Sequence, residues 1–253
     1  MIRLKSPKQI DGIREASRLL VTVLQETAGL VEPGISTREL SAFAHKRVGE
    51  LGARAAFLGY MDFPAAICAS VDEAVIHGIP GDDRLREGQI VSIDFGVEYQ
   101  GYYSDSAVTI PVGEISPEVR ALMDATKESL RLGIEQARAG KRVNDISRAI
   151  YEHNRKAGYG IVRPYCGHGV GLEIHEDPQV PNYVGTGPNP RLKPGMVLAI
   201  EPMINLGGDD VRLLDDDWTV VTADASISAH FEHTIAIHKD HTEVLTRWDD
   251  QSW

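Results

Sequence analysis

Apolar side chains recur at helical spacing in the first part of the chain. Ser6-Pro7-Lys8-Gln9 has the form of a capping box with proline at the first helical position. The apolar residues that follow it at helical intervals are Ile10, Ile13, Leu20, Val23 and Leu24. This pattern predicts a helix over roughly residues 7–29.

A second capping box, Ser36-Thr37-Arg38-Glu39, precedes another helical run. The apolar positions of this run are Leu40, Phe43, Val48 and Leu51, and Gly52 supplies a stop signal. Further along, Ser116-Pro117 predicts a helix to about residue 138 that Gly140 ends, and Asn144 predicts the cap of a helix to about residue 157. The helices therefore come in two pairs.

Between about residues 66 and 112 the pattern changes to short β-rich runs that glycines interrupt. Residues 90–95 and 101–111 flank a turn-like Tyr99-Gln100-Gly101, which is typical of an antiparallel hairpin. Each arm of this hairpin carries one acid, Asp94 or Asp105. An unpaired buried carboxylate is costly, so a cation should face these two side chains.

Two segments of the chain echo one another. Residues 85–94 (LREGQIVSID) align without gaps with residues 192–201 (LKPGMVLAIE), and an acid, Asp94 or Glu201, closes each copy. With the order of helices and strands, this repeat favours a duplicated α+β half. Chance similarity between two strands that each follow a glycine is the alternative. In a duplicated fold the two acids would face one another across a pseudo-twofold axis.

Length and composition favour one globular domain over residues 1–253. Of the 253 residues, 42% are apolar and 25% are charged, and no linker-like or low-complexity tract marks a boundary. The net charge of -11 disfavours a phosphate-binding surface, so nucleic acid is not an expected partner.

The location of the protein and the state of its cysteines can also be predicted. The N-terminal residues lack a secretory apolar core, and no stretch approaches the roughly 20 apolar residues of a membrane span. We therefore expect a cytoplasmic protein without a membrane anchor. The cysteines, Cys68 and Cys166, are expected to be reduced thiols rather than a disulfide.

Five residues have the chemistry of a metal site: Asp94, Asp105, His168, Glu201 and Glu232. Oxygen-rich ligands with one imidazole suit Mn, Fe, Co or Zn without choosing among them. Four carboxylates carry about four negative charges, which two divalent cations would offset and a single one would not. The set therefore favours two divalent metal ions, although each acid taken singly reads as a solvated or salt-bridged side chain.

Residues 165–183 (YCGHGVGLEIHEDPQVPNY) hold His168 and His175. Glycines flank His168 on both sides, which removes side-chain bulk where a backbone must approach another group closely. The seven-residue spacing differs from the i, i+4 pair of a helical zinc motif. One histidine could therefore be a ligand and the other a proton or hydrogen-bond donor.

On these residues the chain resembles the type I methionine aminopeptidases of peptidase family M24. The resemblance runs from about residue 4 to residue 246. It includes His-Gly-Ile-Pro at 77–80, the Asp94/Asp105 pair, the 165–183 segment, Ile-Glu-Pro at 200–202 and Phe-Glu-His-Thr at 231–234. It implies the α+β pita-bread fold, in which pseudo-twofold duplicated halves form a curved antiparallel sheet covered by helices.

The resemblance also implies roles for the site residues. The five ligands would hold two divalent metals, with Asp105 and Glu232 bridging them, and Glu201 would be the general base. His175 would hydrogen-bond the scissile carbonyl, and His77 would contact the substrate backbone near the scissile amide. On the sequence alone, His77 reads equally well as a turn residue.

An apolar pocket for methionine is implied at Tyr60, Phe63, Cys68 and Trp218, with His77 at its edge. Two positions depart from the family. Ile174 stands where many relatives place an aromatic residue, which bears on the shape of the pocket. Asp72 stands where a relative's asparagine can help to hold a monovalent cation, and this leaves such a site open.

The implied function is the removal of the initiator methionine from nascent proteins by two-metal-assisted hydrolysis, preferentially when the second residue is small. The expected partners are the N-terminal methionines of polypeptides and peptides, with the ribosome as a transient partner, and we expect a monomer. A proline-directed aminopeptidase or dipeptidase shares the fold and the ligands but usually carries a large extra N-terminal domain. A non-catalytic pita-bread binding module characteristically loses ligands, and a carboxylate-rich metal store would not need the non-ligand histidines.

Overall fold

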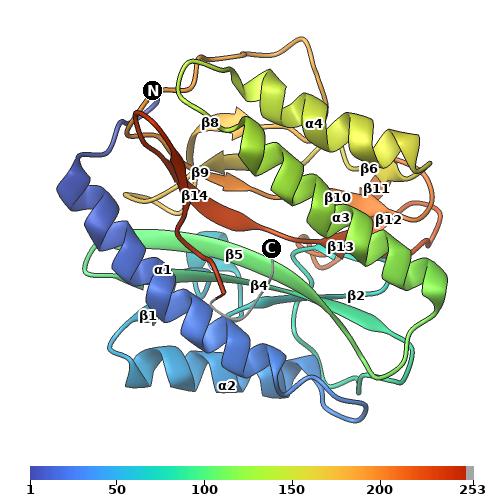
Figure 1. Cartoon of the computed structure of the whole chain (residues 1–253). Helices are drawn as coiled ribbons and strands as arrows, with labels where there is room; N and C mark the ends of the chain where they lie inside the picture. The colour runs from blue at the N-terminus through green and yellow to red at the C-terminus, as the bar shows by residue number, and fades with distance from the viewer. Residues whose placement is uncertain (249–253) are drawn as a thin grey trace.

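Four α-helices, arranged in two pairs, cover the strands of the protein (Figure 1). The computed structural model describes residues 1–248, and the counts given below refer to this range. The helices are Pro7–Ala28 (α1), Thr37–Glu50 (α2), Pro117–Gln136 (α3) and Val143–Lys156 (α4), and one 3-10 turn spans Tyr60–Asp62 (η1). None of these helices has the combination of length and apolar character that crossing a bilayer requires.

The two predicted capping boxes are confirmed, whereas the predicted cap of α4 is wrong. The Ser6 and Ser36 hydroxyls each accept the N–H three residues on, and the side chain at that position accepts the cap N–H in return. Helix α4 begins one residue before Asn144, with Arg142 at the cap. The N–H of Asn144 instead donates to the Asn189 side chain at 3.0 Å, so a distant loop caps this helix.

The strands of the first half are Arg54–Ala55 (β1), Cys68–Val71 (β2), Ala74–Ile76 (β3), Ile90–Tyr99 (β4) and Tyr102–Pro111 (β5). Strands β4 and β5 form the predicted hairpin, and β1 and β2 pair with the other edge of β4. Helix α1 packs on β4 and β5, and α2 packs on β1 and β2. All of these strand pairs are antiparallel.

The described part of the second half contains more strands, none of them as long as β4 or β5. They are Gly160–Ile161 (β6), Gly167–Gly169 (β7), Glu176–Val180 (β8), Val197–Ile200 (β9), Met203–Asn205 (β10), Val211–Leu213 (β11), Val220–Thr222 (β12), Ser228–His230 (β13), His233–Ile237 (β14) and Thr242–Val244 (β15). The largest sheet has the order β15-β14-β9-β7-β8, and smaller sheets are β13-β10-β6 and β11-β12-β3. Helices α3 and α4 cover this half, and α3 ends at Gln136, before Gly140.

The two halves are joined where β5 meets β13 and β14. The Thr234 hydroxyl donates to the carbonyl oxygen of Asp105 at 2.7 Å and accepts the Asp105 N–H at 3.1 Å. The Ser106 hydroxyl donates to the carbonyl oxygen of Glu232 at 2.7 Å, and the Glu232 N–H donates to Ala107 O at 2.9 Å. These bonds fix the predicted ligands of the two halves against one another.

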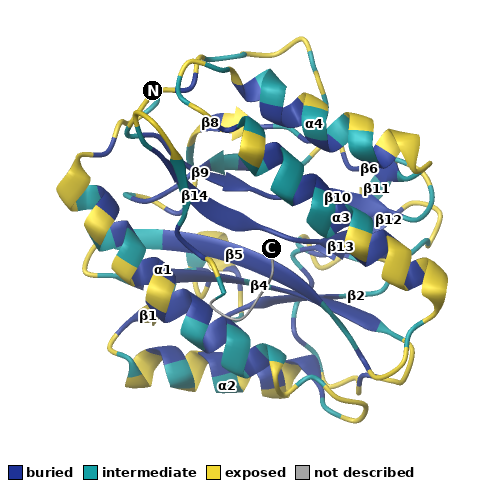
Figure 2. Cartoon of the chain, in the orientation of Figure 1, coloured by how far each residue is buried: buried dark blue, intermediate teal, exposed yellow. Residues whose placement is uncertain are grey.

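Burial follows the amphipathic patterns of the helices. The faces of α1 and α3 that lie against the strands are buried, and their opposite faces are exposed (Figure 2). Ile13, Leu20 and Leu24 on α1 are at most 1% exposed, and Leu20 and Leu24 share one buried cluster with the fully buried Phe95 on β4. The core therefore fills the space between each helix pair and its strands.

The glycines that flank His168 lie where other backbones approach β7. A Cβ atom on Gly167 would lie 2.4 Å from Ala199 O on β9, and one on Gly169 would lie 2.3 Å from Asp177 O on β8. Strand β7 therefore lies in close contact with β8 and β9, and the His168 side chain projects from it. The predicted close approach of a backbone at these glycines is confirmed.

We predict that Gly169→Ala lowers the free energy of unfolding by about 1–3 kcal/mol, because a backbone oxygen blocks the added methyl group. Equilibrium denaturation in urea measures this change. Gly49→Ala is the matched control: the Gly49 position in α2 has free space for a Cβ, so this change should stabilise the protein by roughly 0.5–1 kcal/mol. Equal stability of Gly169→Ala and the wild type would contradict the steric interpretation.

Candidate metal centre

A cavity of about 190 Å³ brings the predicted site residues together. Its lining contains every one of them: Tyr60, Phe63, Cys68, His77, Asp94, Asp105, His168, His175, Glu201, Trp218 and Glu232. Phe57 and Met61 complete the lining and were not predicted. The cavity therefore lies where segments from both halves of the chain converge.

The β4–β5 hairpin places Asp94 and Asp105 side by side. Asp105 pairs with Gly96, and Gly96 projects from the same face of β4 as Asp94, two residues earlier. The two acids are therefore diagonal neighbours on one face of the hairpin. Cys68 pairs with Asp94 from the other side and brings its thiol to the same cavity.

Strands β7, β9 and β14 repeat this arrangement in the second half. His168 pairs with Ala199, and Glu201 follows Ala199 by two residues, so His168 and Glu201 are also diagonal neighbours. Glu232 immediately precedes β14, whose first residue, His233, pairs with Ile200. Asp94 and Glu201, which close the two echoing segments, thus reach the same cavity.

The four carboxylates have no cationic side chain beside them. Among the described residues that line the cavity none is Lys or Arg. Burial raises the pKa of Asp94 to about 7. Burial first, and then the neighbouring carboxylates, raise the pKa values of Asp105 and Glu232 well above the usual range, and burial with the charge of Asp94 does the same for Glu201. An ionised cluster in this place requires an external cation.

The donor atoms fit divalent metal ions. Within residues 1–248, Asp94 Oδ1, Asp105 Oδ1 and Glu232 Oε1 are buried without a hydrogen-bond partner. Three sets of donor atoms lie within 4.8 Å of one another in the described chain. One contains His175 with Asp105 and His168, and the two without His175 are Asp94 with Asp105 and Glu232, and His168 with Glu201 and Glu232. Glu232 belongs to both of the latter sets, so the cluster can be divided into two adjoining sites that share one carboxylate.

His168 presents a neutral nitrogen to this cluster. Its Nδ1 lies 2.9 Å from Gly169 O, which can only accept, so Nδ1 carries the proton. Burial lowers the pKa of His168 to about 3. The unprotonated Nε2 therefore faces Glu201 Oε1 at 3.5 Å and Asp105 Oδ2 at 3.9 Å, as a metal-ligating imidazole requires.

His175 and His77 lie at the edge of the cluster. The His175 Nδ1 atom is 2.9 Å from the Tyr60 hydroxyl, and its ring centroid is 4.4 Å from that of His168. Burial lowers the pKa of His77 to about 4, so this side chain is neutral at pH 7. His77 has a φ of 58°, a strained backbone conformation for a residue other than glycine. It is thus both a turn residue and a residue of the cavity wall.

The apolar part of the cavity is formed by aromatic side chains and a thiol. Phe57, Phe63, Cys68 and Ile174 form one buried cluster, against which Tyr60 and Trp218 pack. The rings of Phe63 and Trp218 meet edge to face with centroids 5.0 Å apart. Both cysteines are free, and burial raises the pKa of the Cys68 thiol well above its usual value, so Cys68 is a neutral wall residue.

Sequence reasoning missed His230. This imidazole is 1% exposed, and its Nε2 lies 3.7 Å from Glu201 Oε2, on the side of Glu201 away from His168. Burial lowers its pKa to about 3. The signal was present, because His230 stands only two residues before the predicted ligand Glu232.

The comparisons with known proteins agree with this geometry. A protein-family model described as "Metallopeptidase family M24" matches residues 11–239. A methionine aminopeptidase of Treponema pallidum is 49% identical, over 97% of this chain and 96% of its own length. The crystal structure of methionine aminopeptidase from Rickettsia prowazekii has a TM-score of 0.95 and 38% identity, and the match covers 98% of this chain and 100% of that one.

The fold extends to a second class of peptidase. The prolidase from Pyrococcus furiosus has a TM-score of 0.80 and 26% identity, and the match covers 97% of this chain but 66% of that one. The match thus leaves the remainder of the prolidase chain unaligned. The predicted α+β pita-bread fold is confirmed by these structural neighbours.

We predict that Asp94→Asn stabilises the metal-free protein above pH 7 and has no effect near pH 4. The folded-state pKa of Asp94, about 7, exceeds the value of 3.8 expected for the unfolded chain, so ionisation of Asp94 costs stability progressively as the pH rises between these values. The gain is at most about 4 kcal/mol. Urea denaturation in a chelator at several pH values measures it.

Asp124→Asn, at an exposed position on α3, is the control for removing a charge and should show no such pH dependence. Added divalent metal should reverse the order of stability at pH 8, because the wild type binds it through the carboxylate that the variant lacks. A wild-type advantage in chelator at pH 8 would contradict the assignment of an uncompensated carboxylate.

Proposed function

The chain belongs to metallopeptidase family M24, and we propose that it is a metal-dependent aminopeptidase that removes the initiator methionine from newly made polypeptides. The observation that carries the proposal is the cavity itself, in which a complete carboxylate and imidazole cluster opens onto a small aromatic pocket. We further propose that substrates with a small second residue are preferred.

The proposed metal ligands are Asp94, Asp105, His168, Glu201 and Glu232, with two divalent ions drawn from Co, Mn, Fe and Zn. When bound, such ions polarise a peptide carbonyl and supply hydroxide at neutral pH. The shared carboxylate of Glu232 supports two adjoining ions rather than one. His168 contributes a neutral nitrogen. This imidazole ligand favours transition metals over hard cations that prefer oxygen ligands only.

Glu201 is the proposed general base. One of its oxygens faces His168 and the other faces His230, so its carboxylate is oriented from both sides. Because Glu201 lines the cavity beside the other proposed ligands, its carboxylate can accept a proton from the attacking water and pass it to the leaving amine. His230 would act here through its contact with Glu201 and not on the substrate.

His175 and His77 are the proposed hydrogen-bond donors to the substrate. The Tyr60 hydroxyl can donate to Nδ1 of His175, which leaves the Nε2–H free to donate to the scissile carbonyl as negative charge develops there. His77 is neutral at pH 7 and can donate to the substrate backbone at no cost in charge. Both therefore act without becoming cationic beside the metal ligands.

The proposed methionine pocket is lined by Tyr60, Phe63, Cys68 and Trp218, with Phe57 as an additional wall. An unbranched thioether packs well against aromatic edges and a sulfur atom. Ile174 packs against Phe57 behind this pocket and does not line it, so the departure at residue 174 lies outside the pocket wall. The volume of about 190 Å³ favours one side chain and excludes a longer segment of peptide.

The proline-directed alternative is disfavoured by the weaker likeness to the prolidase, which is 26% identical with a TM-score of 0.80, whereas the Rickettsia methionine aminopeptidase is 38% identical with a TM-score of 0.95. The binding-module alternative is disfavoured by the complete ligand set. The proposal also retains a single domain over residues 1–253 that acts as a monomer in the cytoplasm, where nascent chains are made, with the ribosome as a transient partner. A monovalent cation near Asp72 is retained as well, although both carboxylate oxygens there accept hydrogen bonds, from Gln89 and from the Ile90 N–H.

We predict that metal-free protein resupplied with Mn, Fe, Co or Zn releases methionine from Met-Ala-Ser and does so much more slowly from Met-Leu-Ser. Ala-Pro-Ser should remain uncut. Glu201→Gln should lower kcat by at least about a hundredfold, because the amide cannot accept the proton. Cleavage of Ala-Pro-Ser would move the protein to the proline-directed branch, and no cleavage with any of the metals would favour the binding module.

We predict that His175→Ala and His168→Ala differ in their effect on metal content. The donor atoms of His175, Asp105 and His168 lie within 4.8 Å of one another, so geometry alone allows His175 to be a ligand. In the proposed mechanism His175→Ala lowers kcat by about 10²–10³-fold with both metals retained, whereas His168→Ala loses metal. Elemental analysis after dialysis, beside peptide kinetics, separates the two, and metal loss from His175→Ala would overturn its assigned role.

A further inference from the structure

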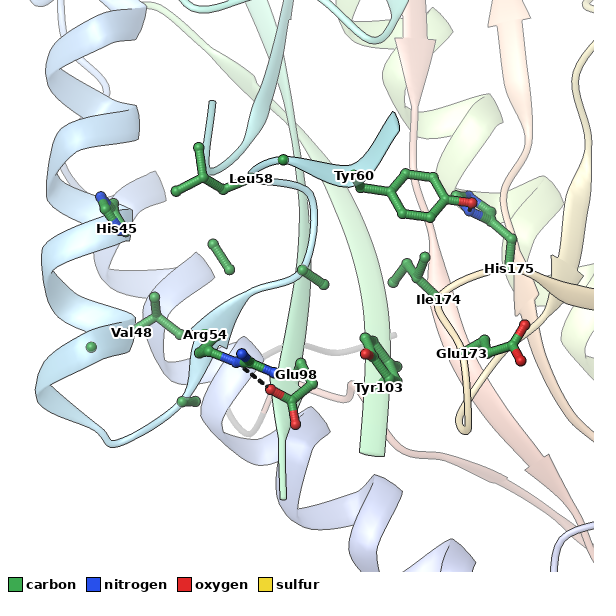
Figure 3. A pocket seen from close by; sticks show the side chains of 15 residues that line it. His45, Val48, Arg54, Leu58, Tyr60, Glu98, Tyr103, Glu173, Ile174 and His175 are labelled. Atoms are coloured by element: carbon green, nitrogen blue, oxygen red, sulfur yellow. Dashed lines mark hydrogen bonds and ion pairs between the residues drawn. The ribbon is translucent and has the colours of Figure 1, made fainter. Parts of the chain in front are cut away.

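A second, larger cavity adjoins the candidate metal centre (Figure 3). Its volume is about 680 Å³, and we call it the outer groove. Val48 on α2, Arg54 and Ala55 on β1, Leu58, and Ile174 beside His175 contribute to its walls. In Figure 3 the labelled side chains extend from His45 and Val48 on one side to Tyr60 and His175 on the other.

The outer groove adjoins the catalytic cavity, and the two share part of one wall. Tyr60 and His175 line both, and the hydrogen bond between them forms part of the shared wall. Another cavity of about 590 Å³ lies beside Ile79 and Thr219, but it shares no lining residue with the catalytic cavity among the described residues. A chain that leaves the catalytic cavity past His175 therefore enters the outer groove.

The two cavities differ in what they can hold. The catalytic cavity accommodates the first side chain of a polypeptide, and the remainder of that polypeptide must lie elsewhere. Pockets that enclose a drug-sized ligand measure about 300–1,000 Å³. The volume of the outer groove falls in this range, and that of the catalytic cavity lies below it. The groove is large enough for a short peptide segment.

One wall of the outer groove is an edge strand. Strand β1 pairs with β4 on one side only, and it ends the order of its sheet. The Ala56 N–H donates to Gly96 O on β4 at 2.8 Å. Successive residues of a strand direct their backbone groups to opposite sides, so the N–H and C=O of Ala55 point away from β4 and are available to an extended peptide.

The charged side chains of the groove are already paired. Arg54 Nε donates to Glu98 Oε2 at 2.6 Å, and Glu173 accepts from Arg3 at 2.7 Å. Besides these pairs, the groove offers a ligand the Ala55 backbone, apolar surface at Leu58 and Ile174, and the polar side chains of His45 and Tyr103. Such a surface recognises main chain and shape rather than a particular sequence, as an enzyme that processes many different proteins requires.

We propose that the outer groove binds the part of the polypeptide substrate that follows its second residue, in an extended conformation alongside β1. The substrate backbone exchanges hydrogen bonds with Ala55, and its side chains contact Leu58 and Ile174. This inference rests on the proposed function, because the groove would bind the rest of the polypeptide whose first residue lies in the catalytic cavity.

The test compares the amidated tripeptide Met-Ala-Ser with an amidated, uncharged heptapeptide that begins with the same three residues. Amidation removes the terminal carboxylate from both, so the comparison reports length alone. The wild type should show a kcat/KM about tenfold higher for the heptapeptide, mainly through a lower KM. A heptapeptide with N-methylated amides beyond the third residue should lose this advantage, because it cannot donate to the strand edge.

Two variants locate the effect in the groove. Ala55→Pro removes the N–H that points away from β4, and an edge strand tolerates proline at such a position. Leu58→Glu places a charge on the apolar wall of the groove, at a side chain that is 44% exposed. Each should abolish the length advantage and change tripeptide hydrolysis less than about twofold, since the tripeptide does not reach these residues. Leu30→Glu, at a leucine that is 38% exposed and lines no described cavity, is the matched control and should retain the advantage.

The outcomes separate the two proposals. Tripeptide cleavage without a length advantage in the wild type, or an advantage that survives in both groove variants, overturns the outer groove and leaves the catalytic assignment in place. Absence of cleavage of either peptide with every metal overturns the proposed function and the groove together. Should Ala55→Pro fail to fold, Leu58→Glu and the N-methylated peptide decide the question.

Discussion

The gathering of four carboxylates around one cavity is the constraint on which the rest of the structure depends. Asp105, Glu201 and Glu232 are at most 8% exposed, and no Lys or Arg lines the cavity in the described chain. When these carboxylates are ionised they repel one another. In the absence of bound cations, the backbone segments that carry them must be held together by hydrogen bonds. The bonds of Thr234 to Asp105 and of Ser106 to Glu232 serve this purpose, because they clamp the backbones that carry the charges.

The same arrangement explains why the imidazoles are neutral. A protonated histidine beside the carboxylates would form an ion pair and compete with a metal for them. Burial lowers the pKa values of His168 and His230 to about 3 and that of His77 to about 4, so these side chains remain ligands or hydrogen-bond donors at neutral pH. The negative cluster therefore stays open to divalent cations, and the polar atoms around it stay available to a peptide.

In the proposed mechanism the catalytic cavity binds the first side chain of the substrate and the outer groove binds the chain that follows. The catalytic cavity is closed by Phe63 and Trp218 at its apolar end, which restricts it to one side chain, whereas the outer groove is open and bounded by an edge strand. Tyr60 and His175 form the boundary between them. A change in the position of His175 would therefore affect both the scissile carbonyl and the path of the downstream chain.

The sequence by itself determined much of the fold and of the candidate site. Local signals are sufficient for helix starts such as Ser6 and Ser36 and for the β4–β5 hairpin, since a capping box and a turn involve neighbouring residues. The acids could be selected because a carboxylate in an apolar strand is costly wherever it lies. His168 was marked by its flanking glycines, whose need for space is a property of the local backbone.

Only the tertiary structure decided what depends on contacts between distant segments. The cap of α4 comes from Asn189, more than forty residues from the helix start, and the contact of His230 with Glu201 joins the end of β13 to the residue that follows β9. The outer groove likewise exists because α2, β1 and the loop at His175 converge. Such features follow from the packing of the two halves, and the sequence carries no periodicity that records them.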